Sequence, residues 1–314
     1  MTRAVIEIVQ AGPLVTVQDG GRPGLMRYGV PASGPMDRGA FAIANAALGN
    51  PDGTAGIEIS VGGLVLDCVE GAVTIALAGG GFRVALDGHD YPSWLVATLA
   101  AGMRLSVKPG LWGSWSYLGF AGRLDAKPWL GSVSTHGPSG FGGGRLMAGR
   151  RLIVADAERR EARVGELDCP VSARPRHSVK VVLGPQDRFF SPETIETLLS
   201  APFTLTDAYD RMGARLAGPS LKPDAVLDMP SEPIARGSIQ VSGDGVPAVL
   251  LADHQTTGGY PKIATIVGDH LDGFVQLRSR AQVAFSAISP QAAVEAARTR
   301  RFLQARYLAR LRGG

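Results

Sequence analysis

Residues 246–267 read VPAVLLADHQTTGGYPKIATIV and place a dense polar cluster between two apolar runs. The runs 246–251 and 263–267 are short and apolar, which predicts two buried strands. The polar segment is therefore predicted to be the tip of a strand–loop–strand unit. Its glycine pair lets backbone N–H groups approach a ligand closely, and such groups can form an anion-binding concavity. A solvated hairpin tip is the alternative, because polar loop tips are common.

The composition limits the classes of protein that this chain can represent. Its 314 residues suit two domains or one large one, and 45% apolar with 19% charged residues is ordinary for a packed soluble protein. The formal net charge of +4 is diffuse, apart from an arginine-rich segment near the C-terminus. No basic stripe with interleaved aromatic residues is present, so we expect no nucleic-acid partner.

The cysteines and the N-terminus predict the compartment. Cys68 and Cys169 lie far apart without a CxxC partner, which argues against a disulfide framework or a zinc site and fits a reducing compartment. The N-terminus has no apolar signal core, and no run approaches the length of a membrane span. We therefore expect a cytoplasmic protein with no membrane partner and no metal bound by its own residues.

The first half of the chain reads as mainly β structure with one helix. Residues 4–9 and 14–17 are predicted to form a hairpin around a Gly-Pro turn. A helix is predicted to begin after Ser33 or Asp37, either of which can cap it, and to end at Gly49. Residues 56–122 contain many short apolar runs separated by turns, as in a barrel or sandwich. Glu58, between two isoleucines, faces either solvent or a polar barrel mouth.

The second half repeats this order of strands, loops and one helix after a charged, proline-marked linker at 158–176. A glycine-rich loop at 137–144 precedes the linker and is either a mobile lid or a flexible surface loop. Further elements are predicted after it: strands at 179–183, 237–241, 274–277 and 283–285, a helix opened by Ser191 and Pro192, and a solvated terminal helix at 290–311 capped by Ser289. The shared rhythm predicts two related barrel-like units.

Several motifs together resemble a known family. They are Gln-Asp-Gly-Gly-Arg at 18–22, Gly-Val-Pro-Ala-Ser-Gly-Pro-Met-Asp at 29–37, Asn45 with Gly-Asn at 49–50, Asp-Arg-Met-Gly at 210–213 and Gln-Thr-Thr-Gly-Gly-Tyr-Pro at 255–261. They resemble the family of the bacterial 5-oxoprolinase C subunit, also labelled allophanate hydrolase subunit 2 or KipI antagonist, and are similar to the carboxyltransferase domain of urea carboxylase. The resemblance runs from Val5 to about Ile288. It implies a mainly β fold of two cyclophilin-like β-barrel subdomains with a few short helices, at 1–170 and at 171–314 with the C-terminal helix.

The resemblance also implies an activity and its partners. The family opens the lactam of 5-oxoproline to glutamate with ATP hydrolysis, so this chain is expected to be a hydrolase subunit acting on a cyclic amide. It implies a B-type (KipI-like) partner subunit, an A subunit, and ATP shared with these partners together with Mg²⁺. Two alternatives stay open: a carboxyltransferase subunit of a biotin-dependent urea or amide carboxylase, and a non-catalytic regulator that binds a partner. No biotin-attachment segment appears, so any biotin would arrive on a partner.

Candidate site residues follow from the chemistry of a lactam, a poor electrophile whose activation builds up negative charge. Lys262 can bind an anionic oxygen, and a carboxylate can accept a proton or orient a metal. The predicted catalytic residues are Asp253, Gln255, Thr256 and Lys262. The predicted substrate-binding residues are Arg22, Ser33, Asp37, Asn45, Arg215, Glu232, Gln240, Thr257, Gly258, Gly259 and Tyr260. Structural alternatives are a helix cap for Asp37, a solvated edge position for Lys262, and a hydrogen-bonded loop imidazole for His254, which the family motif does not require.

Overall fold

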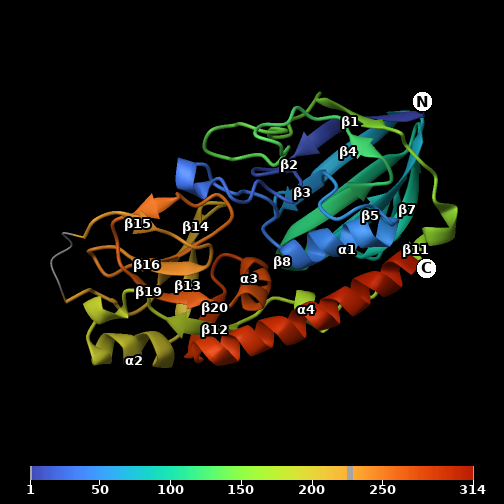
Figure 1. Ribbon diagram of the computed structural model, residues 1–314. Coiled ribbons are helices and arrows are strands. Elements are labelled where there is room, and N and C mark those ends of the chain that lie inside the picture. The colour runs from blue at the N-terminus through green and yellow to red at the C-terminus, as the bar shows by residue number, and fades with distance from the viewer. Residues whose placement is uncertain (1, 225–228, 314) are drawn as a thin grey trace. The chain divides into compact units, whose positions relative to one another are not determined.

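The computed structural model describes residues 2–224 and 229–313. The chain folds as two compact units, each described by itself below (Figure 1). The first contains Met1–Arg22, Ser33–Arg174 and Leu303–Gly314, and the second contains Pro23–Ala32 and Pro175–Phe302. Strands dominate both units, which confirms the mainly β prediction.

The first unit is built on one large sheet with strand order β11-β7-β5-β8-β4-β1-β10-β9, to which β6 adds through β5, β3 through β8, and β2 through β3. The long strands β5 and β8 pair along most of their length and carry the core. The strands are β1 (Arg3–Ala11), β2 (Thr16–Gln18), β3 (Gly56–Ser60), β4 (Leu64–Glu70), β5 (Ala72–Leu86), β6 (His89–Tyr91), β7 (Leu95–Ala100), β8 (Arg104–Phe120), β9 (Arg123–Leu124), β10 (Arg151–Ala155) and β11 (Gly165–Glu166).

The predicted hairpin of residues 4–9 and 14–17 is wrong. β1 pairs with β4 on one edge and with β10 on the other, so neither edge is open to β2. β2 pairs with β3 instead. The chain does turn at Gly12 and Pro13, but a turn does not specify which strands pair when later strands bury the same apolar face.

Helix α1 (Arg38–Leu48) confirms the predicted helix, and it packs on β5 and β8. The N–H of Ala40 donates to Asp37 Oδ1 at 2.9 Å, which confirms Asp37 as the N-cap. Gly49 ends the helix with φ of 72°, a left-handed conformation that favours glycine. Gly119 on β8 lets the helix approach closely, since a Cβ there would lie 3.1 Å from Leu48 Cδ1.

The second unit is a closed seven-stranded barrel with order β12-β19-β16-β17-β14-β13-β20 and a separate two-stranded ribbon, β15-β18. Ala214, Val249, Ile239 and Ala264 lie opposite one another on adjacent strands and are fully buried, so they mark the barrel interior. The strands are β12 (Ser178–Leu183), β13 (Phe203–Tyr209), β14 (Gly213–Ala217), β15 (Glu232–Pro233), β16 (Ser238–Val241), β17 (Pro247–Leu250), β18 (Thr257–Gly258), β19 (Lys262–Ile266) and β20 (Gln282–Ala287).

Short helices complete the second unit. Helix α2 (Pro192–Ser200) is capped by Ser191, as predicted, and the 3-10 turn η4 (Asp187–Phe189) follows β12. The strand predicted at 274–277 is wrong, because Phe274 and Val275 end helix α3 (Gly268–Val275). They share its buried side with Leu271, and a short apolar run of this kind suits a helix as well as a strand.

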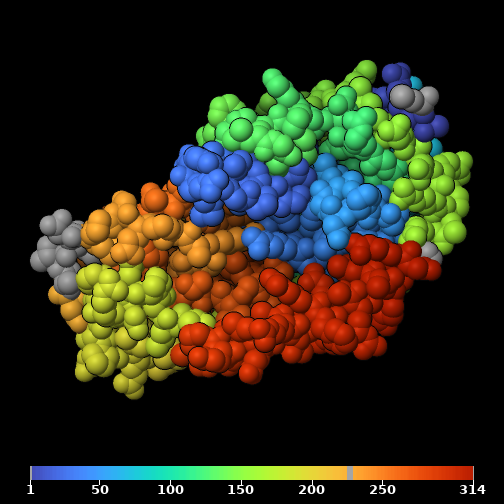
Figure 2. Space-filling view, viewed as in Figure 1, coloured from blue at the N-terminus to red at the C-terminus, as the bar shows by residue number. Residues whose placement is uncertain are grey.

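Helix α4 (Pro290–Gly313) confirms the predicted terminal helix and its cap, since the N–H of Ala292 donates to Ser289 Oγ at 3.1 Å. At 24 residues it is the longest described helix. None of its residues is buried, and Figure 2 shows one side of it uncovered along its length. Arg163 donates to the carbonyls of Leu311 (2.9 Å) and Arg312 (2.8 Å), which satisfies two groups at its C-terminal end. No helix within the described residues combines the length and apolar character needed to cross a bilayer.

Candidate functional site

The barrel of the second unit aligns four residues across adjacent strands. Arg215 on β14 lies opposite Ala248 on β17, Ala248 lies opposite Gln240 on β16, and Gln240 lies opposite Lys262 on β19. Directly opposed residues share a face of a sheet. Because their neighbours Ala214, Val249 and Ile239 fill the interior, Arg215, Ala248 and Gln240 lie on the outer face of the barrel wall; the register shifts between Ile239 and Gln240, so alternation does not extend to Lys262.

The β15–β18 ribbon brings further polar groups to the Lys262 end of this row. Glu232 on β15 pairs with Gly258 on β18. A Cβ at Gly258 would lie 2.9 Å from Gln240 Nε2 and 2.8 Å from Ile234 Cδ1, so only glycine fits without displacing these side chains. Gln240 is fixed from two sides: it donates to the carbonyl of Tyr260 at 3.2 Å, and its Oε1 accepts from Gln255 Nε2 at 3.4 Å.

Gln186, which is not among the residues predicted from the sequence, links these elements. Its Oε1 accepts from the N–H of Lys262 at 2.9 Å, and its Nε2 donates to Glu232 Oε2 at 2.6 Å. Its own N–H donates to the carbonyl of Lys262 at 3.2 Å. Its side chain is buried, so this one amide joins β19 to β15. We call Gln186, Glu232, Gln240, Gln255, Gly258 and Lys262 the Lys262 cluster.

The side chain of Lys262 is the chemical centre of the cluster. It is only 1% exposed, and its Nζ has no hydrogen-bond partner among the described residues. Burial lowers its pKa from the ordinary value of 10.5, while the negative charge of Glu232 acts in the opposite direction. The solvated-edge interpretation is therefore wrong. An unpartnered buried ammonium costs free energy of folding, so Lys262 stays a candidate for binding a ligand.

Other residues of the 252–263 loop have visible structural partners. Asp253 is fully buried, and both its oxygens accept from Arg211, at 2.9 and 3.0 Å. Nδ1 of His254 lies 2.6 Å from the carbonyl of Gln255, and burial lowers the pKa of this imidazole. These contacts fit a buried ion pair that anchors the loop and a hydrogen-bonded loop imidazole.

The remaining loop candidates lie around the edge of the cluster. The carbonyl of Thr256 accepts from the N–H of Ile234 at 3.1 Å, which attaches the loop to β15. Thr257 is exposed on β18, and Tyr260 is 49% exposed. Gly259 follows the ribbon and has room for a methyl group, since the nearest atom to its Cβ would lie 3.5 Å away.

In the first unit, Asp37 and Glu58 belong to a buried polar network. Glu58, which is fully buried on β3, accepts from the hydroxyl of Tyr117 at 2.8 Å and from the N–H of Met36 at 2.7 Å. The same Tyr117 oxygen accepts from the N–H of Asp37 at 2.7 Å. Burial, then the charges of Glu58 and Asp37, raise the pKa of Tyr117 well above 10. Glu58 thus faces this network and not solvent, and the network positions the start of α1.

The other candidates of the first unit are also anchored. Asn45 Nδ2 donates to the carbonyl of Thr54 at 3.0 Å, and its Oδ1 accepts from Asn50. Arg22 donates to the carbonyls of Trp129 and Ser134 and lies over the Trp129 ring. Ser33 is different, because its backbone is left-handed (φ of 52°) and its buried hydroxyl has no partner among the described residues. Ser33 therefore stays a candidate for ligand contact.

Comparison with known proteins identifies the family. The model described as carboxyltransferase domain, subdomain A and B, matches residues 28–287. The chain belongs to this family. The matched range of this carboxyltransferase-domain protein includes the whole Lys262 cluster and the Glu58–Tyr117 network, whereas Arg22 and α4 lie outside it.

Relatives of this family member include both short and long proteins. It is 34% identical to the 5-oxoprolinase C subunit of Escherichia coli over 84% of each chain. It is 33% identical to urea amidolyase of Saccharomyces cerevisiae over 86% of this chain but only 15% of that protein. The crystal structure of the K. lactis urea amidolyase matches 99% of this chain and 20% of that one, with a TM-score of 0.85 and 26% identity. The fold therefore occurs both in a chain of similar length and as one part of much larger enzymes.

The side chains that commonly bind metals do not converge in the described structure. Across residues 2–224 and 229–313, no three His, Cys, Asp or Glu side chains are grouped so that they could hold a metal ion. The donor set of the Lys262 cluster is an ammonium, three amides and one carboxylate. Such a set suits an organic ligand with anionic oxygens and an amide edge better than it suits a bare cation.

Proposed function

We propose that this chain is the C-type subunit of a 5-oxoprolinase, which opens the lactam of 5-oxoproline to glutamate with ATP hydrolysis. Its partners would be a B-type subunit and an A subunit. The 34% identity to the Escherichia coli 5-oxoprolinase C subunit over most of both chains supports the assignment. The single observation that carries it is the buried Lys262 ammonium, which is unpartnered among the described residues and is acted on by the charge of Glu232.

The cluster matches the two functional groups of 5-oxoproline. The ammonium of Lys262 would bind a carboxylate oxygen, or a lactam oxygen as it gains negative charge. The carboxamides of Gln240 and Gln255 offer both donors and acceptors, as recognition of a lactam N–H and C=O requires. Glu232 opposes the effect of burial on the pKa of Lys262 and so favours the charged form that the anion needs.

The proposed reaction needs ATP and Mg²⁺. When bound, ATP supplies the phosphoryl group that activates the lactam oxygen. The Lys262 ammonium fits a phosphoryl oxygen as well as a carboxylate, so this chain's residues suit one end of such a group. The described residues offer no cluster of carboxylates for Mg²⁺, so we propose that the ion arrives with the nucleotide and that partner subunits complete the ATP site.

A second candidate function is carboxyl transfer from a biotinylated partner to urea or another amide. The family description and the similarity to urea amidolyase favour it. A carboxylated biotin also presents a carboxylate and an amide-like ring, so the same Lys262 cluster suits it. A third candidate is a regulator that binds a partner without turnover.

Reconstitution separates the three candidates. The chain would be purified alone and with its B and A partners, and glutamate and ADP would be measured with 5-oxoproline and ATP. We expect glutamate and ADP in equal amounts from the complex and little from the chain alone, because we propose that the site is completed by partners. Consumption of ATP that needs bicarbonate, urea and a biotinylated partner would favour carboxyl transfer. Stable complexes without either turnover would favour the regulator, and full activity of the isolated chain would falsify the shared site.

A further inference from the structure

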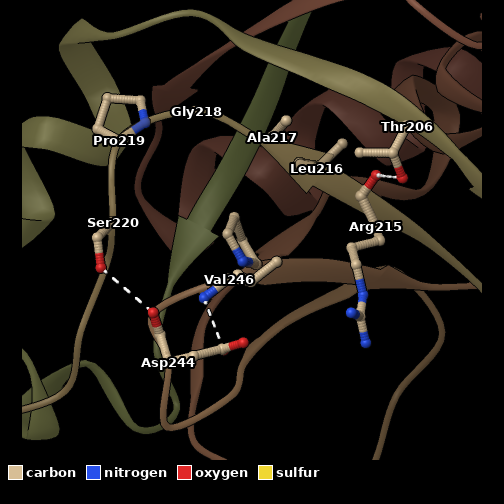
Figure 3. A pocket seen from close by; sticks show the side chains of 11 residues that line it. Thr206, Arg215, Leu216, Ala217, Gly218, Pro219, Ser220, Asp244 and Val246 are labelled. Carbon is tan, nitrogen blue, oxygen red and sulfur yellow. Dashed lines mark hydrogen bonds between the residues drawn. The ribbon is translucent and has the colours of Figure 1, made fainter.

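An open pocket of about 320 Å³ lies on the barrel of the second unit and shares no residue with the Lys262 cluster. Strands β13 and β14 and the turn that leads into β17 form it (Figure 3). Pro219, Val246 and Pro247 contribute apolar walls. Small-molecule pockets begin at about 300 Å³, so this volume suits a ligand of few atoms.

Two opposite charges line this pocket without neutralising each other. The guanidinium of Arg215 makes no hydrogen bond or ion pair with any described residue; the residue is held through its backbone, whose carbonyl accepts from Thr206 Oγ1. Asp244 is held by its own turn, since Ser242 Oγ (2.5 Å) and the N–H of Val246 (3.2 Å) both donate to its Oδ1. Its Oδ2 has no partner in the described part of the chain. In Figure 3 both ionic groups lie below Val246.

The electrostatics show that the two groups interact at a distance. The pKa of Asp244 is lowered, first by the hydrogen bond from Ser242, then by that from Val246, with a smaller contribution from the charge of Arg215. Asp244 is therefore ionised at neutral pH. The pocket presents a fixed carboxylate and an unpaired guanidinium that are near each other but do not form an ion pair.

We propose that this pocket binds a small zwitterionic α-amino acid. The ligand carboxylate would pair with Arg215, its ammonium would pair with Asp244 Oδ2, and its side chain would lie against Pro219 and Val246. A lone carboxylate would be attracted to Arg215 but repelled by Asp244, and a lone amine would meet the opposite conflict. Only a molecule that carries both charges can pair with both Arg215 and Asp244. In this proposal Arg215, predicted from the sequence to bind substrate, serves a separate pocket.

Three matched ligands test the proposal by calorimetric titration of the full chain. They are L-valine, 3-methylbutanoate, which lacks the ammonium, and isobutylamine, which lacks the carboxylate. We expect saturable binding of L-valine, and binding at least about tenfold weaker for each single-charge analogue. Equal affinity for all three, or no saturable binding of L-valine, would overturn the proposal.

Substitutions then assign each charge to its partner. Asp244→Asn should weaken L-valine binding and at the same time remove the discrimination against 3-methylbutanoate. Arg215→Gln should weaken both of these ligands. Arg301→Gln on the exposed side of α4 is the matched control and should leave every affinity unchanged; the same loss in this variant would contradict a local site. The measurements use no partner and no turnover, so their outcome is independent of the proposed 5-oxoprolinase activity.

Discussion

At the scale of single residues, we expect the Lys262 ammonium to lower the stability of the fold and to contribute to the proposed activity. A buried ammonium without a partner costs free energy of folding, and methionine keeps the unbranched stem without the charge. We expect Lys262→Met to stabilise the folded chain by roughly 1–3 kcal/mol. The same change should lower kcat/KM of the reconstituted complex about tenfold to more than a hundredfold, because a charge-assisted contact with substrate is lost. Thermal unfolding and steady-state kinetics measure the two effects.

Lys180→Met is the control for this change, since Lys180 is exposed on the neighbouring strand β12. Lys180→Met should change neither the free energy of unfolding nor kcat/KM appreciably. Unchanged kinetics in Lys262→Met would remove Lys262 from the site, and a lower melting temperature would assign it a structural role.

The depressed pKa of Lys262 predicts a pH dependence with a definite sign. Because the pKa in the folded state lies below the ordinary value of 10.5, the ammonium is lost at a lower pH than in the unfolded chain. Binding of an anionic substrate should therefore weaken as pH rises through this lowered pKa. The burial penalty disappears over the same range, so the free energy of unfolding should increase with pH. Profiles of kcat/KM and of unfolding between neutral pH and 10.5 test this, and Lys262→Met should flatten both.

Adjacent glycines provide a matched pair at the cluster. A Cβ at Gly258 would displace the ends of Gln240 and Ile234, whereas a Cβ at Gly259 meets only ordinary van der Waals contacts. We expect Gly258→Ala to raise KM of the complex severalfold with a small loss of stability, because the atoms that must move are the ends of flexible side chains. Gly259→Ala should behave like the wild type. Equal kinetic effects of the two substitutions would show that the Gln240 amide does not matter for substrate.

At the scale of elements, the Glu58–Tyr117 network connects β3 and β8 to the start of α1. Tyr117→Phe removes one hydroxyl that both donates to Glu58 and accepts from the N–H of Asp37. Since both groups are buried, we expect a loss of about 2–4 kcal/mol in the free energy of unfolding. Chemical denaturation measures this loss. Tyr91→Phe, at a 44% exposed position, is the control and should change stability little; a similar loss there would show that the network is not the cause.

Local sequence signals predict helix caps well, but they predict poorly which strands pair with each other. The caps at Asp37, Ser191 and Ser289 can be predicted because each residue bonds within its own first turn. The pairing of β1 with β10 and β4 cannot, since it is decided by which apolar faces meet after the sheet closes.

The candidate site also depends on distant segments that local sequence signals do not bring together. One dense segment of sequence is enough to predict Lys262 and the neighbouring glycines. Gln186 lies 76 residues away in sequence and escapes prediction, because only closure of the barrel brings its amide to Lys262. Its position directly after an apolar strand, in a Gly-Pro-Gln turn, is the one available signal. Asp253 looks as reactive as Lys262 in the sequence, and only the structure shows that it forms a buried ion pair with Arg211.

At the scale of the whole molecule, the end of α4 stabilises the first unit. Arg163 donates to Leu311, Arg312 and the Ala47 carbonyl near the end of α1, and Tyr307 donates to the Asp168 carbonyl at 2.6 Å. We expect a chain ending after Phe302 to melt several degrees lower, at about 2–4 °C per kcal/mol lost. Arg163→Ala should cost more in the full chain than in the truncated one, because most of its partners are then absent. Additive losses would indicate that the two changes act independently, and Arg159→Ala serves as the control.

The division of the chain into units also has a consequence for synthesis. Pro23–Ala32 emerges early from the ribosome but belongs with Pro175–Phe302, and the first unit is completed only by residues that follow Phe302. Each unit combines segments that are far apart in the chain, so part of its contacts can form only after much later residues are made. Fast translation or timely chaperone binding should therefore improve the yield of native protein more than it would for two units encoded one after the other.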